Sequence, residues 1–328
     1  MKPPLFWYQD QSIIGALLSP LGFLYSAATA YRLRQSPTHR ATVPVICIGN
    51  INAGGTGKTP TVIALTQRLI EFGQIPHIVS RGYGGSTGGP VQVEPTTQNA
   101  NEMGDEPLLL AAFAPTWVSK DRAQGVKAAE AAGATVILLD DGFQNPNVYK
   151  DLNIVVVDAI KGFGNGRVIP AGPLREPTKA GFARADSVLT IGTDEARAAF
   201  MPDLPLHCVR VNGQLDALPT GMPWDGLRVL AFAGIGYPEK FFATLRDLGA
   251  DVVRSERLDD HQPFTNTLLT RLETEAKSRG LIMVTTEKDA TRLPDSFRSK
   301  VTVLPVRLSV LDWRPFDAKL ALLGITRR

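Results

Sequence analysis

Residues 45–59 read VICIGNINAGGTGKT, an apolar run that turns into a glycine-rich segment ending in Gly57, Lys58 and Thr59. Between a buried strand and a helix, such a turn presents successive backbone N–H groups and a helix N-terminus to an anionic group. Lys58 would then reach the β- and γ-phosphates of a nucleotide, and the Thr59 hydroxyl is suited to hold Mg²⁺. The segment therefore predicts a phosphate-binding loop for ATP or GTP.

One position departs from the usual pattern GxxxxGK[ST], because Asn52 stands where the pattern has glycine. Asparagine tolerates positive φ better than other non-glycine residues, and Gly54 and Gly55 can form the tight part of the turn. A plain connection into a helix that starts at Thr59-Pro60 would explain the proline but not the preceding lysine. We therefore expect the nucleotide to be bound by Asn52, Ala53, Gly54, Gly55, Thr56, Gly57, Lys58 and Thr59.

The size and charge of the chain narrow the possible classes of protein. Its 328 residues exceed what one hydrophobic core usually serves, and 44% hydrophobic and 20% charged residues are typical of a globular protein, so we expect two domains. A formal charge of +3 without a dense Lys/Arg tract gives no field for nonspecific nucleic-acid binding, so no nucleic-acid partner is expected. Cys47 and Cys208 lie in apolar runs without metal-binding spacing and are interpreted as core residues in a reducing compartment.

An uncharged segment, 11–31, lies between Asp10 and Arg32. It is long enough to cross a bilayer, but its serine, threonine, glycine and proline residues make it only moderately apolar. The aromatic residues 6–8 ahead of it and the arginines after it suit a lipid headgroup interface, whereas Lys2 alone is a poor start for a secretory signal. We expect a helical hairpin or a helix lying on a membrane surface, with a helix packed on the protein's own core as the alternative.

From residue 43 onward, apolar runs rich in β-formers alternate with segments of helical period. The expected strands are 43–48, 75–79, 116–118, 135–139 and 154–157, and the expected helices are 60–72, 106–113 and 121–132. The strands are continuous Val/Ile/Leu runs, which indicates burial on both faces, as in a parallel sheet covered by helices. This part of the chain predicts a doubly wound α/β domain.

The passage 162–177, GFGNGRVIPAGPLREP, is too irregular for a regular element and longer than ordinary connections, which is typical of a functional loop or a linker. After it, we expect strands at 187–191, 207–211, 228–233, 282–285 and 301–305, and helices at 238–248 and 265–279. These elements predict a second α/β structure, with the boundary between residues 185 and 225.

Acidic residues follow predicted elements at two places. Asp140 and Asp141 end a buried strand, at the edge where open parallel sheets bind ligands, and they can hold Mg²⁺ directly or through water. A simple strand-ending turn is the alternative. Asp105 precedes an apolar helix, where a carboxylate can serve as a base, although the residues alone favour an N-cap.

Other candidates give weaker signals. His261 lies in the segment DDHQPF, whose carboxylates can fix its tautomer or favour its charged form, but a lone loop histidine is usually solvated. Arg175 and Glu176 can reach a phosphate and a metal or hydroxyl, with ordinary surface charges as the alternative. The segment 80–85, SRGYGG, offers a cation and an aromatic ring near the nucleotide, and 285–289, TTEKD, can contact the base or ribose or form a capping box.

Taken together, these motifs resemble those of the tetraacyldisaccharide 4′-kinase family. The resemblance rests on eight segments that occur in order across most of the length of the chain: GNINAGGTGKTP, SRGYGG, GDEPLLLA, DDGFQN, PAGPLREP, AGIGYPEKFF, DHQPFT and TTEKDATRL. It implies ATP-dependent phosphorylation of the 4′-hydroxyl of tetraacyldisaccharide 1-phosphate, giving lipid IVA at the cytoplasmic face of the inner membrane. Asn52 resembles the family's own variant of the loop, and a monomer is expected.

The resemblance also implies an organisation and residue roles. The expected parts are a membrane-associated helical segment over 1–40, a P-loop ATP-binding α/β domain over 41–205, and a second, smaller α/β domain with a β linker over 206–328 that closes over the nucleotide. The implied roles are phosphate and Mg²⁺ binding for Lys58 and Thr59, acid positions near Mg²⁺ for Asp140 and Asp141, a base at Asp105 paired with His261, and the reaction centre for Arg175 and Glu176. The base role of Asp105 follows from the resemblance, against the N-cap reading.

Two other functions share part of this pattern. A membrane-recruited P-loop nucleotide switch would use the loop, the acidic strand end and the N-terminal anchor, but needs no acid–histidine pair from opposite domains. A P-loop ligase acting on a soluble carboxylate would leave the apolar N-terminal segment without a purpose.

Overall fold

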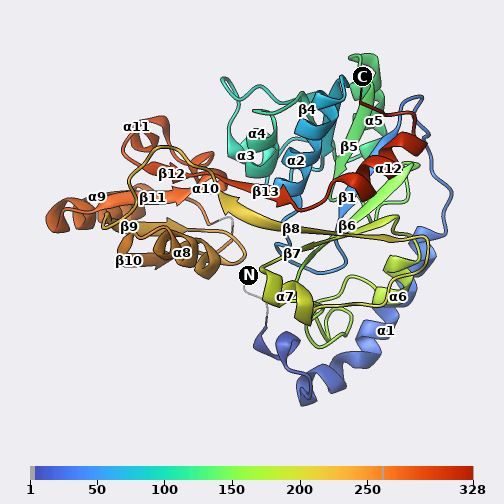
Figure 1. Ribbon diagram of the computed structural model, residues 1–328, viewed down its shortest axis with the longest axis horizontal. Coiled ribbons are helices and arrows are strands. Elements are labelled where there is room, and N and C mark those ends of the chain that lie inside the picture. Colours follow the sequence, from blue (N-terminus) through green and yellow to red (C-terminus); the bar gives the residue numbers. More distant parts are fainter. Residues whose placement is uncertain (1–3, 261, 328) are drawn as a thin grey trace.

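The chain forms two β-sheets that lie toward opposite ends of its long axis (Figure 1). The computed structural model describes residues 4–260 and 262–327. One sheet has nine strands and the other has four, which confirms the predicted α/β fold class. We refer to residues 45–217 and 306–322 as the large-sheet part and to residues 228–304 as the small-sheet part.

The large sheet is parallel except at its two edges. Its strand order is β13-β8-β7-β6-β1-β5-β2-β4-β3, and the antiparallel pairs are β13 with β8 and β3 with β4. The strands are β1 (Val45–Gly49), β2 (Pro76–Ser80), β3 (Val91–Gln92), β4 (Thr116–Val118), β5 (Val136–Asp140), β6 (Leu152–Asp158), β7 (Ser187–Ile191), β8 (Val209–Ala217) and β13 (Val306–Val310).

The central strands of the large sheet are buried at every position. Because alternate side chains of a strand point to opposite faces, both faces of the sheet are apolar. In β1, Ile46 and Ile48 join a core with α2 and α12, whereas Val45 and Cys47 join a second core with α5 and α6. The helices of this part are α2 (Lys58–Glu71), α3 (Ala100–Met103), α4 (Asp105–Leu110), α5 (Arg122–Ala131), α6 (Thr178–Phe182), α7 (Asp194–Ala199) and α12 (Arg314–Leu322). Cys47 and Cys208 are both buried, as predicted.

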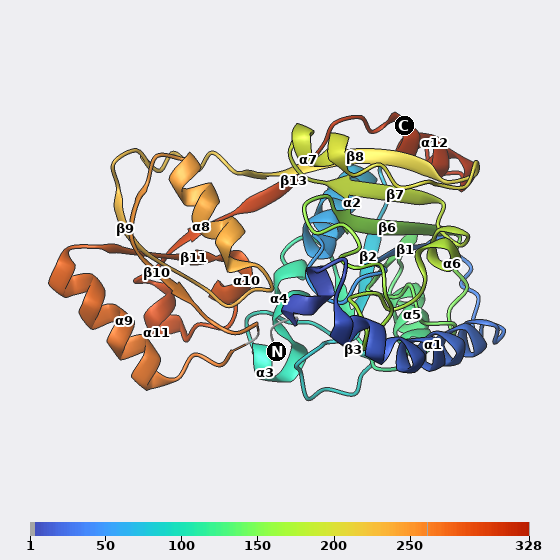
Figure 2. The ribbon, with the colours of Figure 1, turned by 90° about the horizontal axis from the view of Figure 1, so that it is seen from below.

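The small-sheet part repeats this layering. Its parallel strands, in spatial order, are β10 (Asp251–Arg257), β9 (Arg228–Ala233), β11 (Ile282–Thr286) and β12 (Thr302–Leu304). The helix α8 (Pro238–Asp247) packs on one face and α9 (Asn266–Arg279) on the other, with α10 (Glu287–Ala290) and α11 (Asp295–Arg298) at the ends of the later strands. In Figure 2, β13 runs from the small-sheet part to the edge of the large sheet, where it pairs with β8.

The structure corrects several expected boundaries. Residues 209–217, which we expected in the second domain, form β8 and pair with β7 in the large sheet. The strands β10 and β13 and the helix α12 were not expected from the sequence. The strand β10 reads DVVRSER and lies at a sheet edge, where partial exposure permits the charged side chains that hide it in the sequence.

A single long helix, α1 (Ile13–Leu33), follows the short helix η1 (Leu5–Tyr8) near the N-terminus. The expected helical hairpin is therefore wrong, since Pro20 lies inside the continuous helix. Among the described helices, α1 is the one long and apolar enough to cross a membrane, a test that core helices and signal sequences also pass. Several of its large apolar side chains face outward, with Ile13 78%, Leu17 74% and Leu24 63% exposed, so it is not a core helix.

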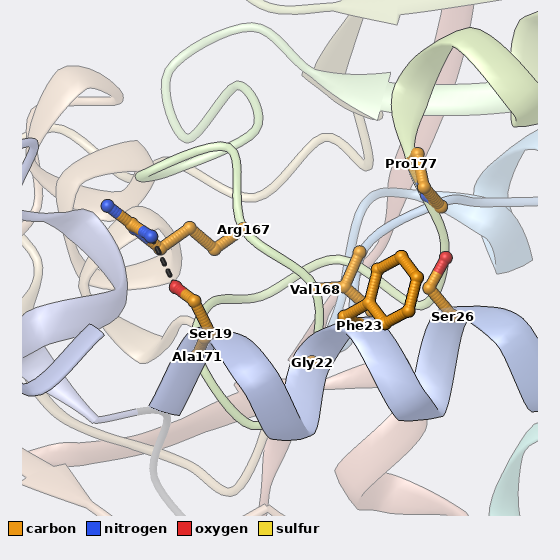
Figure 3. Close-up of a pocket in the computed structure, with 8 residues that line it drawn as sticks. All are labelled: Ser19, Gly22, Phe23, Ser26, Arg167, Val168, Ala171 and Pro177. Atoms are coloured by element: carbon orange, nitrogen blue, oxygen red, sulfur yellow. Dashed lines mark hydrogen bonds between the residues drawn. The ribbon is translucent and has the colours of Figure 1, made fainter. Parts of the chain in front are cut away.

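The opposite side of α1 rests on the passage 162–177 through small residues. A β-carbon at Gly22 would lie 2.7 Å from the Val168 carbonyl oxygen, and Arg167 donates to the Ser19 hydroxyl (Figure 3). The Trp7 indole N–H ahead of α1 donates to the Pro170 carbonyl at 3.0 Å. A groove of about 220 Å³ remains between the helix and the passage, beside Gly22. The helix thus lies along the protein with its apolar side outward.

We expect Gly49→Ala to destabilise the fold, because a β-carbon there would lie 2.4 Å from the β-carbon of Phe143. Overpacking of this kind typically costs about 1–3 kcal/mol. Urea unfolding followed by circular dichroism measures the change. Gly88→Ala is the control, since a β-carbon there meets nothing within 4 Å. Equal free energies of unfolding for the two variants would contradict this account of Gly49.

Candidate functional site

The phosphate loop joins β1 to α2 at the carboxyl edge of the large sheet. Gly54 and Gly57 have φ values of 117° and 96°, which side chains with a β-carbon rarely adopt. Asn50 Nδ2 donates to the Gly54 carbonyl at 3.2 Å and closes the turn. Gly57 is the N-cap of α2, so Lys58 and Thr59 occupy its first turn. The loop therefore has the strand–turn–helix context that phosphate binding requires.

Asn52 does not take the expected backbone conformation. Among the described non-glycine residues, Asp141 alone has positive φ, so the turn depends on Gly54 and Gly57 instead. Asn52 is 5% exposed, and its side-chain nitrogen donates to the Gly162 carbonyl at 2.6 Å. Residues 53–59 line the cleft described below, but Asn52 is not part of that wall. Its side chain supports the loop from behind.

The passage 162–177 supplies further support to the phosphate loop. The Ala53 N–H donates to the Pro173 carbonyl and the Arg175 N–H donates to the Ile51 carbonyl, each at 2.7 Å. These bonds continue the contact that Asn52 makes with Gly162. The passage therefore packs against the phosphate loop and stabilises it, and it also places Arg175 in the cleft.

Asp140 lies at the end of β5 in an environment that disfavours its charge. Its Oδ2 accepts from the Ser80 hydroxyl at 3.0 Å, while its buried Oδ1 has no hydrogen-bond partner among the described residues. Burial, followed by the negative charges of Glu106 and Asp141, raises the pKa of Asp140 to about 7. Asp140 therefore has one oxygen without a hydrogen-bond partner, and a nearby cation would stabilise its ionised form.

Asp141 is in the opposite situation. Its Oδ1 lies 2.9 Å from Arg175 Nη1 and 3.7 Å from Lys58 Nζ. Burial alone would raise the pKa of Asp141, but the charges of Lys58 and Arg175 outweigh it and lower this pKa to about 2. Asp141 thus joins the phosphate loop, the end of β5 and the passage 162–177.

These residues fit a magnesium ion. Mg²⁺ takes oxygen ligands and keeps several waters, so it needs few protein carboxylates. Asp140 and Thr59 both line the cleft, and the buried Oδ1 of Asp140 has no hydrogen-bond partner among the described residues. In the described part of the chain, no group of three or more His, Cys, Asp or Glu side chains forms a complete metal site. An ion here would therefore take its remaining ligands from water or from phosphate oxygens.

Glu176 does not line the cleft. It is 2% exposed, and its carboxylate accepts from Arg184 at 2.7 and 2.9 Å and from Gln144 Nε2 at 3.0 Å. Gln144, which does line the cleft, also donates to the Asn50 carbonyl at 2.8 Å. Glu176 thus reaches the phosphate loop through Gln144, and its implied place at the reaction centre remains a prediction.

Asp105 is the first residue of α4, not its N-cap. Gly104 holds the N-cap position with φ 88°, so the N-cap reading is wrong. The Asp105 side chain is 2% exposed, and its Oδ1 accepts from the Glu106 N–H at 2.9 Å. Two cations from the small-sheet part lie near its Oδ2, Arg292 Nε at 3.6 Å and Lys288 Nζ at 4.0 Å. A base role for Asp105 remains a prediction.

His261 lies outside the described residues. The residues on either side of it contact the same two cations that face Asp105. Asp260 Oδ1 lies 3.8 Å from Lys288 Nζ, and Arg292 Nη1 donates to the Gln262 carbonyl at 2.8 Å. The loop that carries His261 therefore reaches the neighbourhood of Asp105, and the pairing of the two remains a prediction.

One cleft of about 950 Å³ lies at the phosphate loop and is lined by the large-sheet part, the small-sheet part and α1. The large-sheet part contributes Lys58, Thr59, Asp140, Asp141 and Arg175, the small-sheet part contributes Tyr237, Lys240, Phe241 and Lys288, and α1 contributes Tyr25 and Arg32. Arg81 and Tyr83 from the segment 80–85 also line it. The arrangement can hold a phosphorylated ligand between the two sheets and still admit a second molecule from the side of α1.

Sequence reasoning missed some residues of this cleft. Arg122 is 5% exposed, and its Nη2 donates to the Asp141 carbonyl at 2.8 Å. It follows β4 at the same carboxyl edge as Asp140, a position that the strand order would have indicated. In the segment 285–289, Thr286 caps α10 by accepting from the Asp289 N–H at 3.1 Å, whereas Lys288 reaches the cleft.

Comparisons with known proteins agree with this geometry. The family model described as "Tetraacyldisaccharide-1-P 4'-kinase" matches residues 14–323. The tetraacyldisaccharide 4′-kinase of Jannaschia sp. (strain CCS1) is 58% identical over 320 residues, covering 97% of this chain and 98% of that protein. That of Dinoroseobacter shibae is 56% identical over 336 residues and covers both chains fully. The crystal structure of "apo" form LpxK from Aquifex aeolicus in complex with ATP matches with a TM-score of 0.75 at 26% identity, covering 95% of this chain and 99% of that chain.

The raised pKa of Asp140 predicts that Asp140→Asn stabilises the ligand-free protein above about pH 7. The folded-state pKa is about 7 against an ordinary value of 3.8, so the folded protein holds the extra proton between these values and loses stability as pH rises through them. The slope approaches about 1.4 kcal/mol per pH unit. Asparagine mimics the neutral acid and removes this loss.

Urea unfolding at several pH values between about 4 and 8 measures this effect. Asp203→Asn, at an exposed position, is the matched control. A pH dependence of Asp140→Asn that follows the unmodified protein would show that the carboxyl is not strained by burial.

Proposed function

The chain belongs to the tetraacyldisaccharide-1-P 4′-kinase family, and from this membership we propose how its residues carry out the reaction. It is an ATP-dependent kinase that transfers the γ-phosphate of ATP to the 4′-hydroxyl of tetraacyldisaccharide 1-phosphate, forming lipid IVA in lipid A biosynthesis. A nucleotide switch without lipid phosphotransferase activity is not favoured. The observation that supports our assignment of roles is the single cleft shared by the phosphate loop, both sheets and α1.

In our proposal, the backbone amides of residues 53–59 and the Lys58 ammonium bind the phosphates of ATP. Thr59 and Asp140 would hold Mg²⁺, with Asp141 as a nearby acid. When bound, Mg²⁺ neutralises charge on the phosphates. Arg175 stabilises negative charge on the transferring group, which electrostatic catalysis requires. In the ligand-free chain, Asp141 keeps Lys58 and Arg175 within the cleft through contacts of 3.7 and 2.9 Å.

We assign the proton transfer to Asp105, paired with His261, and a supporting role behind the phosphate loop to Glu176. A carboxylate within reach of the acceptor hydroxyl can accept its proton as the new bond forms. Burial disfavours a charged carboxylate, but the two cations near Asp105, Lys288 and Arg292, offset this cost and favour the ionised form that a base requires.

The nucleobase has a suitable place at the other end of the cleft. Apolar side chains from both parts line the cleft beside the connection between the sheets: Ile63, Ile191, Leu215, Phe241, Leu304 and Val306. Ligand pockets commonly combine such an apolar wall with a few polar groups that fix orientation. We assign the adenine ring to this wall, which leaves the phosphates to the loop 53–59.

We propose three functional parts of the chain: residues 1–40 as a membrane-associated segment, the large-sheet part as the P-loop domain, and the small-sheet part as a domain that closes over the nucleotide. The strands β8 and β13, at the edge of the large sheet, lead into and out of the small-sheet part and so serve as the β linker. The role of a hinged second domain is to complete the site while excluding water, which would otherwise hydrolyse ATP.

We further propose that α1 lies on the cytoplasmic face of the inner membrane and that the protein acts as a monomer. The outward side of α1 is apolar, and its inward side rests on the passage 162–177. Tyr25 and Arg32 of α1 line the cleft, so a lipid held at this helix has access to the phosphate loop. This arrangement suits an acyl-bearing substrate with a polar sugar head.

Asp105→Ala should lower turnover in a lipid kinase assay by a factor on the order of 10² to 10⁴, the range of general-base contributions. The affinity for ATP should change little, because Asp105 is not part of the phosphate loop. Production of phosphorylated disaccharide from ATP by the purified protein is the measurement. The control is Asp247→Ala, an exposed position on α8. Near-normal turnover of Asp105→Ala would remove this residue from the mechanism.

Replacing Leu17 and Leu24 together by glutamate should weaken binding to anionic lipid vesicles by at least about tenfold, since two apolar side chains would no longer be buried in the bilayer surface. The two residues lie on the outward side of α1 and are 74% and 63% exposed. Vesicle cosedimentation measures the binding. Leu322→Glu, 80% exposed on α12, is the control. Unchanged binding would exclude α1 as the membrane contact.

A further inference from the structure

A cluster of ionic groups joins the two parts of the protein beside the cleft. Lys288 Nζ, from α10 in the small-sheet part, lies 3.0 Å from Glu106 Oε1 and 4.0 Å from Asp105 Oδ2, both on α4 in the large-sheet part. It also lies 3.8 Å from Asp260 Oδ1 in its own part. One ammonium group therefore faces three carboxylates from two different parts of the chain.

Because Asp105 and Lys288 are largely buried, their ionic contacts are screened less by solvent than those of surface ion pairs. The Asp105 side chain is 2% exposed and that of Lys288 is 18% exposed, so neither charge is fully solvated. A buried carboxylate without a nearby cation is strongly destabilising, whereas a buried pair with good geometry is tolerated. Because Lys288 and Arg292 both come from the small-sheet part, Asp105 gains these two cations when that part is in place.

Lys288 lies in the short helix α10, which is fixed by several hydrogen bonds. Thr286 caps α10, and the carboxylate of Asp289 in the same short helix accepts from the Gly234 N–H at 3.0 Å. Glu287, next to Lys288, accepts from Arg307 Nη2 on β13 at 3.0 Å. The backbone at Lys288 is therefore held against both the small sheet and the connecting strand β13, and its ammonium group is held by Glu106.

We propose that Lys288 is a positioning residue that fastens the small-sheet part to α4 and holds the Asp105 carboxylate ionised and correctly oriented for phosphoryl transfer. The effect on turnover rests on the proposed base role of Asp105, whereas the fastening of the two parts does not. The clasp, defined as Lys288 with Asp105 and Glu106, acts on alignment, to which phosphoryl transfer is especially sensitive.

Turnover of Lys288→Met and Lys288→Arg distinguishes positioning from a general contribution to folding. We expect Lys288→Met to lower kcat on the order of 10²-fold, the cost of a misplaced reacting group, with the KM for ATP changed less than about threefold. Lys288→Arg keeps the charge and should restore kcat to within about tenfold of the unmodified protein. The matched control is Lys300→Met, which removes a lysine that pairs with Glu273 inside the small-sheet part.

Removing the partner from the other side tests the same contact if Lys288→Met folds poorly. Glu106→Gln should lower kcat in the same direction, and combining it with Lys288→Met should cost less than the product of the two single losses, because both remove one contact. Normal kcat in Lys288→Met, no rescue by arginine, or independent losses in the double variant would each overturn the proposal.

The distance between the two parts supplies a readout that does not depend on catalysis. Spin labels at Lys127→Cys on α5 and Thr274→Cys on α9, both exposed, report the separation of the large-sheet and small-sheet parts. Lys288→Met should broaden the distance distribution of the ATP-bound protein, and Lys300→Met should not. An unmodified protein that forms no phosphorylated disaccharide would refute the proposed function, whereas an unchanged distance distribution in Lys288→Met would refute the clasp.

Discussion

The site depends on the meeting of Lys58, Asp141 and Arg175. The three residues come from the first turn of α2, the end of β5 and the passage 162–177, and they meet because β1 and β5 are adjacent parallel strands. The contacts are partly buried, with Lys58 13% and Arg175 26% exposed, so they are less screened than surface ion pairs. Opposite charges held at this edge keep two cations ready for a phosphorylated ligand.

The charges of the site are divided between the two parts of the protein. Lys58 and Arg175 belong to the large-sheet part and face the phosphate end of the cleft, whereas Lys288 and Arg292 approach Asp105 from the small-sheet part. Within the large-sheet part, burial raises the pKa of Asp140 to about 7, whereas the charges of Lys58 and Arg175 lower that of Asp141 to about 2. Neighbouring groups with separated pKa values suit different chemical roles.

Much of the large sheet could be predicted from the sequence because its buried strands are continuous apolar runs and its phosphate loop has a distinctive pattern. The strand β10 could not, since its charged residues lie at an edge, and β13 could not, since it pairs with a strand far away in the sequence. The site, too, could be predicted only where it depends on local sequence motifs. Lys58 and Asp140 follow from local motifs, but the burial of Glu176 behind Gln144 and the contact of Lys288 with Glu106 depend on tertiary packing.

The passage 162–177 touches two structures that have different tasks. On one side it supports α1 through the backbone at Val168, and on the other it holds the phosphate loop through Pro173 and Arg175. Because the passage contacts both elements directly, the position of α1 determines the position of the phosphate loop. If α1 floats on the lipid surface, the depth at which it settles also sets the height of the phosphate loop above the headgroups, and so selects which hydroxyl of a half-immersed sugar is level with it.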